Sequence, residues 1–179
     1  MPVPFRDIAT GDGLLVGVLR ILPVEGAGRF AAALLLARGN GEPLEFVYNQ
    51  LDVPATTLCM PDRLPGFMTA MIARSLFTTL EGTPQWIMVC AGEVAPELFE
   101  MRLDVNVPVG ASALPESGDN PGPVWLGTVP PSDDVRTAAG MLIRSGLAAE
   151  MLTRTAAALR DVVARDVLDE PLVGGRAAT

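Results

Sequence analysis

Residues Phe30–Ala37 (FAAALLLA) form an eight-residue run without a single polar position, and this run restricts the fold more than any other part of the sequence. A surface helix needs a polar face, which this run lacks. A strand covered on both faces is apolar throughout, so the run predicts an interior β-strand. Gly39-Asn40-Gly41 follows, and its Asn-Gly pair favours a tight hairpin turn into a second strand at Leu44–Tyr48.

Other apolar runs predict further strands, and a strand-breaking residue such as proline indicates where a strand ends. Gly13–Leu22 is apolar on both alternating faces, and Pro23 is expected to end that strand. Trp86–Cys90 is a continuous apolar run typical of an interior strand, whereas Phe99–Val107 alternates apolar and polar residues and predicts a half-exposed one. A brief strand is expected at Val124–Leu126.

Two segments carry helical signals. Asp62–Leu80 has apolar residues at helical spacing, with Pro65 in its first turn. Ser132 is a good N-cap for a second helical segment, which is expected to run to about Leu168 with a bend at Ser145-Gly146.

The order of these elements predicts an α+β fold. We expect a mixed, largely antiparallel β-sheet, in the order β-β-β-α-β-β, packed by one central helix and a long C-terminal helical segment. One domain is expected over residues 1–179: a sheet-plus-helix core at 13–107, a Pro/Gly-rich loop at 108–131, C-terminal helices at 132–168 and a loose tail at 169–179.

The residue types that are missing exclude several kinds of chemistry. The 179 residues include no histidine, and all 13 basic residues are arginine. Without histidine there is no Ser-His-Asp or Cys-His nucleophile and no imidazole metal ligand. Without lysine there is no Schiff base and no Walker-type phosphate loop.

Charge and cysteine content restrict partners and location. Twenty-one acidic residues against 13 arginines give a net charge of −8, which repels a phosphate backbone, so direct nucleic-acid binding is not expected. No apolar run approaches the length of a membrane span. Cys59 and Cys90 lack C-x-x-C spacing and are interpreted as buried, reduced thiols of a cytoplasmic protein, a Cys59–Cys90 disulfide being the alternative.

A glycine-rich string follows the first predicted strand. The segment from Gly26 through Gly28 to Ala31 matches G-x-G-x-x-A and resembles the dinucleotide-binding fingerprint of Rossmann-like domains. That resemblance implies a helix starting near Phe30 and Asp52 as the acidic residue some way beyond the motif. The alternative is a glycine-rich hairpin loop between two strands.

The predicted order of three strands, a helix and a further strand is similar to the opening of a ribonuclease-H-like core. The resemblance implies a metal-dependent nuclease, in which two or three acidic side chains hold divalent cations that activate water. Its first acid lies within the first strand, whereas Asp12 here precedes that strand. Glu81 stands at the end of the predicted helix, and Glu93 lies beyond Trp86–Cys90. The implied domain is therefore degenerate, and Asp12 and Glu93 are otherwise a turn residue and a loop carboxylate.

One further pair of side chains offers oxygen atoms that could bind a metal ion. Asp104 and Asn106 share one face of the strand expected at Phe99–Val107, where they could contribute to a calcium or magnesium site. A solvated outer face is the alternative and favoured interpretation.

We therefore assign no catalytic residue, cofactor or metal site from the sequence, and enzyme activity is not expected. The functional hypothesis is a non-catalytic acidic interaction or assembly subunit, acting through a protein partner or self-association. The dinucleotide-binding domain and the degenerate nuclease-related domain are its alternatives.

Overall fold

The computed structural model describes residues 13–24, 28–52, 64–91, 93, 107–112, 123–126 and 129–169, without the side chains of 64–69 and 166–169. Six strands are present: β1 (Leu15–Val24), β2 (Arg29–Arg38), β3 (Pro43–Asp52), β4 (Trp86–Cys90), β5 (Val109–Ser112) and β6 (Val124–Leu126). The helices are α1 (Leu64–Thr79), α3 (Asp133–Arg144) and α4 (Leu147–Asp169).

The strands form one mixed sheet in the order β3-β2-β1-β4-β5-β6. β1 and β3 each pair with β2 in antiparallel orientation, and β5 pairs with β6 in the same way. β4 runs parallel to both β1 and β5. The fold is therefore α+β with a mixed, largely antiparallel sheet, as the sequence predicts.

The hairpin predicted around Gly39-Asn40-Gly41 is confirmed. Phe30–Ala37 lies within β2, and every residue from Ala31 to Ala37 is buried. The Gly41 amide donates to the Arg38 carbonyl, and Gly41 itself has a φ of 86°. The strand that follows is longer than predicted, since β3 extends to Asp52.

The end expected for the first strand is wrong. Pro23 does not end β1, because it pairs with Phe30 and the strand continues to Val24. β4 accompanies β1 only from Val16 to Leu19, so among the described strands Pro23 has a neighbour on one side only, where a missing ladder N–H is tolerated.

The Pro/Gly-rich segment 108–131 is not a loop throughout, contrary to expectation. β5 occupies Val109–Ser112 inside this range, and β6 confirms the brief strand at Val124–Leu126. A β-carbon at Gly110 would lie 3.3 Å from atoms of Trp86, Trp125 and Pro123, so the glycine in β5 leaves room for two tryptophan rings. The strand expected at Phe99–Val107 lies outside the described residues except for Val107, and so does the tail from residue 170 onward.

The helices predicted from the sequence are confirmed. The Ser132 side chain accepts a hydrogen bond from the Val135 amide and caps α3. The predicted bend is a break between α3 and α4, where Gly146 has a φ of 77°. The helix predicted at Asp62–Leu80 is α1. No helix in the described part of the chain is long and apolar enough to cross a membrane.

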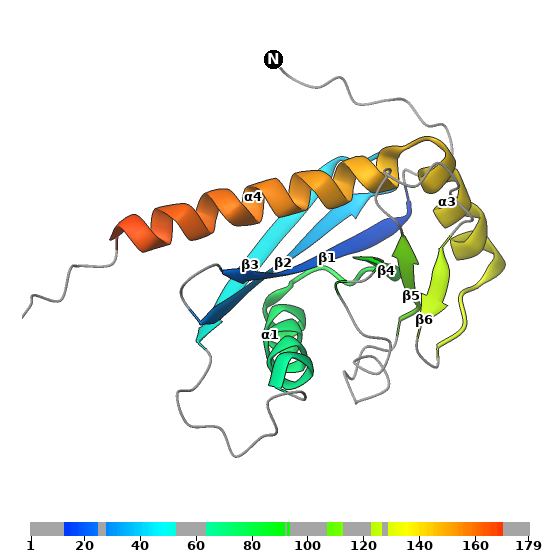
Figure 1. Ribbon diagram of the computed structural model, residues 1–179. Helices are drawn as coiled ribbons and strands as arrows, with labels where there is room; N and C mark the ends of the chain where they lie inside the picture. Colours follow the sequence, from blue (N-terminus) through cyan, green and yellow to red (C-terminus); the bar gives the residue numbers. More distant parts are fainter. Residues whose placement is uncertain are drawn as a thin grey trace, which may run out of the picture.

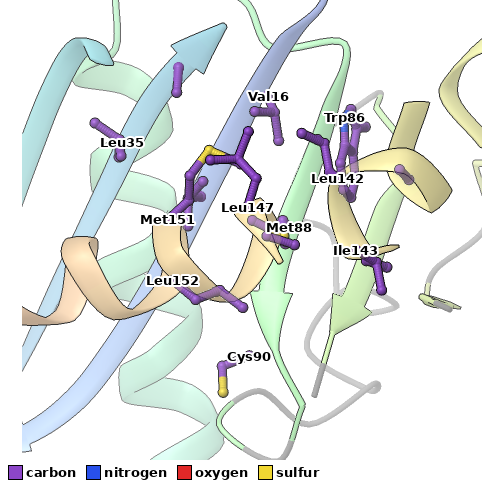
Figure 2. Packing of buried hydrophobic residues seen from close by; sticks show 14 of the residues in the cluster. Val16, Leu35, Trp86, Met88, Cys90, Leu142, Ile143, Leu147, Met151 and Leu152 are labelled. Carbon is purple, nitrogen blue, oxygen red and sulfur yellow. The ribbon is translucent and has the colours of Figure 1, made fainter. Parts of the chain in front are cut away.

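The helices cover opposite faces of the sheet (Figure 1). α1 packs on one face against apolar side chains such as Leu19, Leu34 and Ile87. α3 and α4 cover the other face, where Trp86 and Met88 lie against residues of both helices (Figure 2). The sheet is thus buried on both sides, which explains why β1, β2 and β4 are so largely apolar.

The turn glycines give a testable contrast. Gly41→Ala is expected to lower the free energy of unfolding by about 2 to 3 kcal/mol, since a β-carbon there would be strained at positive φ and would lie 2.8 Å from Leu147 Cδ1. Gly28→Ala is the matched control, because Gly28 has a φ of 57° and open space around it, and about 1 kcal/mol is expected. Urea denaturation measures both values, and equal losses would contradict the contact with Leu147.

Candidate functional site

One charged side chain is buried in the described part of the molecule. Arg20 is 4% exposed and lies in β1, a strand with no other charged residue. Because side chains alternate along a strand, Arg20 shares the face of Val16 and Val18, which is the face covered by α4. A buried charge requires a partner or a change of protonation state, and arginine does not deprotonate in proteins.

The Arg20 guanidinium satisfies that requirement through three hydrogen bonds. Its Nε donates to Glu93 Oε2 at 2.8 Å, and its Nη2 donates to Glu93 Oε1. Its Nη1 donates to the carbonyl oxygen of Leu152 in α4 at 2.6 Å. The bidentate pair therefore joins β1, the turn that follows β4 and the helix above the sheet.

Glu93 reaches Arg20 from the turn beyond β4. Its amide donates to the Cys90 carbonyl at 3.2 Å, and its side chain is 20% exposed. The sequence left Glu93 open as a metal ligand or a loop carboxylate, and the structure shows it as an ion-pair partner. Arg20 was not singled out from the sequence, although it is the one charged residue in the apolar segment LVGVLRILPV.

Cys90 lies at the carboxyl end of β4 (Figure 2), where its thiol is within electrostatic reach of Arg20 and Glu93. Its thiol is free and buried, as the sequence predicts. Burial has the largest effect and raises the pKa of the Cys90 thiol; the charge of Glu93 and its hydrogen bond to the thiol raise it further, whereas Arg20 lowers it. A neutral buried thiol of this kind is a poor nucleophile. Cys59 lies outside the described residues.

This pKa shift predicts slow alkylation. In a Cys59→Ser variant at pH 8, Cys90 is expected to react with iodoacetamide at least about tenfold more slowly in the folded protein than in urea, because burial limits both access and thiolate formation. Mass spectrometry of timed samples measures the rate. Equal rates in the two states would contradict the burial of Cys90.

The acidic residues required by the nuclease resemblance do not assemble in the described residues. β1, α1 and β4 contain no aspartate or glutamate. Within the described part of the chain, no group of three His, Cys, Asp or Glu side chains is placed to hold a metal ion. Asp12, Asp104 and Asn106 lie outside the described residues.

The dinucleotide-binding alternative is wrong. Its fingerprint requires a helix after the glycine turn, but Phe30 and Ala31 belong to strand β2, and Val24 pairs with Arg29 across a hairpin. Gly28, with a φ of 57°, belongs to the turn, and Gly26 lies outside the described residues. Asp52 pairs instead with Arg29, its Oδ1 accepting from Nε at 2.7 Å on the surface.

The negative charge is unevenly distributed along the chain. The described side chains include nine arginines: Arg20, Arg29, Arg38, Arg74, Arg136, Arg144, Arg154, Arg160 and Arg165. They also include nine acids: Glu42, Glu45, Asp52, Glu81, Glu93, Asp133, Asp134, Glu150 and Asp161. The remaining four arginines and twelve acids of the chain, outside this set, account for the whole net charge of −8.

The mixed sheet, with α1 on one face and α3 and α4 on the other, is an arrangement shared with solved structures of endonuclease V. The structure is similar to endonuclease V from Streptomyces avermitilis, with a TM-score of 0.60 and 12% identity over 88% of this chain and 84% of that one. It is also similar to the catalytic domain of human endonuclease V, with a TM-score of 0.50 and 16% identity over 89% and 86% of the two chains. No family model matches the sequence, and no curated protein matches it significantly.

These similarities overturn the main functional hypothesis. The non-catalytic acidic interaction or assembly subunit, with a protein partner or self-association, is wrong, because the fold is shared with nucleic-acid-processing enzymes. The expectation against nucleic-acid binding is wrong for the same reason. That expectation treated the net charge of −8 as a property of the whole surface, whereas the described side chains are balanced in charge.

Proposed function

We propose that this chain binds nucleic acid, as a protein with the endonuclease V fold. The observation that carries the proposal is the similarity to Streptomyces avermitilis endonuclease V over 88% of the chain. A fold shared over this length supports a related ligand class, while the chemistry depends on the residues of the site.

The charge distribution supports the same proposal. Nucleic-acid affinity comes largely from arginine contacts with phosphates, and a field of uniform negative sign would oppose them. Arg74, Arg136 and Arg144 are exposed on the helices of a body whose described side chains are balanced in charge. Screening at physiological ionic strength limits the reach of an exposed charge to about 8 Å.

The proposal extends to organisation and location. We take residues 1–179 to act as one domain, and we place the protein in the cytoplasm. The free thiol of Cys90 supports a reducing compartment.

Fluorescence anisotropy with labelled single-stranded and double-stranded oligonucleotides tests the proposal. We expect micromolar binding at 50 mM NaCl that weakens about tenfold at 200 mM, the loss expected for about two phosphate contacts. An uncharged peptide nucleic acid of the same sequence is the control, and no binding to it is expected. Absence of binding to every oligonucleotide at about 100 µM protein would overturn the proposed function.

A further inference from the structure

The position of Arg20 bears on whether this chain can bind the divalent cations that the nuclease resemblance implies. That resemblance implies divalent cations held by acids on the first strand, in the helix and on the next strand. In this chain β1 carries Arg20, and α1 and β4 carry no acid. The residues of these three elements therefore do not fit such a cation site.

We infer that the Arg20 guanidinium is a fixed internal cation at the carboxyl end of β4, which satisfies Glu93 and excludes a divalent cation from it. The inference rests on the proposed function in one respect, since nucleic-acid binding by this chain would then be independent of metal.

The hydrogen bonds of the pair support this inference. Both oxygens of Glu93 accept from Arg20, so a cation bound to either oxygen would lie beside the positive charge of the guanidinium. Glu93 supplies one negative charge and Arg20 neutralises it, which leaves no net charge to attract a hard cation.

The third hydrogen bond holds the guanidinium in place. Arg20 Nη1 donates to the Leu152 carbonyl at 2.6 Å, and the side chain is 4% exposed beneath α4. An exposed arginine could swing away and release its carboxylate at little cost. For Arg20, such a movement would break three hydrogen bonds and leave a buried charge unpaired.

Manganese binding tests the inference on the full chain. Wild-type protein and Glu93→Ala are titrated with MnCl2 by electron paramagnetic resonance, which measures free Mn²⁺. We expect the two titrations to agree, so that any weak binding to other acidic residues is independent of Glu93. Binding with a Kd below about 1 mM that Glu93→Ala abolishes would overturn the inference.

A gain of binding supplies the converse test. Arg20→Asp places a second carboxylate beside Glu93, and Mn²⁺ affinity is expected to rise at least about tenfold over wild type. Arg20→Met is the matched control, because it removes the charge without adding a ligand, and no gain is expected. A folded Arg20→Asp protein with no gain would contradict the role of Arg20. Thermal unfolding shows whether Arg20→Asp folds. If it does not fold, the comparison of wild type with Glu93→Ala in the manganese titration alone tests the inference.

These measurements contain no nucleic acid, so their outcome is separate from that of the proposed function. If oligonucleotides bind, the affinity in 5 mM MnCl2 is expected to be no higher than the affinity in EDTA, because the divalent cation only competes with the protein for phosphates. A tenfold increase with manganese that depends on Glu93 would overturn this inference and leave the proposed function standing.

Discussion

Glu93→Ala is expected to lower the free energy of unfolding by about 3 kcal/mol, because it leaves the Arg20 guanidinium buried without its counter-charge. For a chain of this length, that loss corresponds to a fall in Tm of about 6 to 12 °C. Urea denaturation followed by circular dichroism measures the free energy, and a thermal scan measures the Tm.

Removing one partner of this ion pair is expected to lower the free energy of unfolding by a different amount from removing the other. Arg20→Met leaves Glu93, which is one-fifth exposed and can regain contact with water, so a smaller loss of about 1 to 2 kcal/mol is expected. The double variant Arg20→Met/Glu93→Ala is expected to be more stable than Glu93→Ala alone, because no charge remains buried.

Asp52→Ala is the matched control for this prediction. Asp52 Oδ1 accepts from Arg29 Nε at 2.7 Å, close to the 2.8 Å between Glu93 Oε2 and Arg20 Nε, but the Asp52 side chain is 74% exposed. An exposed pair contributes little, so a loss of about 0.5 kcal/mol or less is expected. If Glu93→Ala cost no more than Asp52→Ala, the burial assigned to Arg20 would be contradicted.

Much of the fold could be predicted from the sequence, because apolar runs and turn residues act locally. The run Phe30–Ala37, the Asn40-Gly41 turn and the Ser132 cap each depend on residues within a few positions of one another. β5 could not be predicted in this way. Val109–Ser112 is short and contains Gly110, and it is recognisable as a strand through its pairing with β4 and β6 and the rings of Trp86 and Trp125.

The candidate site was harder to predict than the fold. Arg20 and Glu93 are 73 positions apart, and neither lies in a recognisable motif. Their pairing depends on the parallel register of β1 and β4, which brings the turn after Cys90 beside β1. The expectation against nucleic-acid binding failed for a related reason: a net charge does not show where in the folded molecule the charges lie.

Trp86→Ala is expected to lower the free energy of unfolding by about 4 kcal/mol, the largest single loss among these variants. Trp86 is fully buried between the sheet and α3, and its ring centroid lies 5.8 Å from that of Trp125. Truncation to alanine removes this aromatic contact and leaves a cavity that Gly110 cannot fill. Urea denaturation measures the loss, and Trp125 remains as a fluorescent reporter.

Trp86→Phe separates packing from polarity at the same position. The indole Nε1 of Trp86 is buried and has no hydrogen-bond acceptor among the described residues. Its N–H therefore contributes a desolvation cost in the folded state, which phenylalanine removes together with part of the ring. We expect Trp86→Phe to cost about 1 kcal/mol, well below the alanine variant. A loss close to that of Trp86→Ala would mean that the indole N–H is bonded in solution, and the packing account of β4, β5 and α3 would need revision.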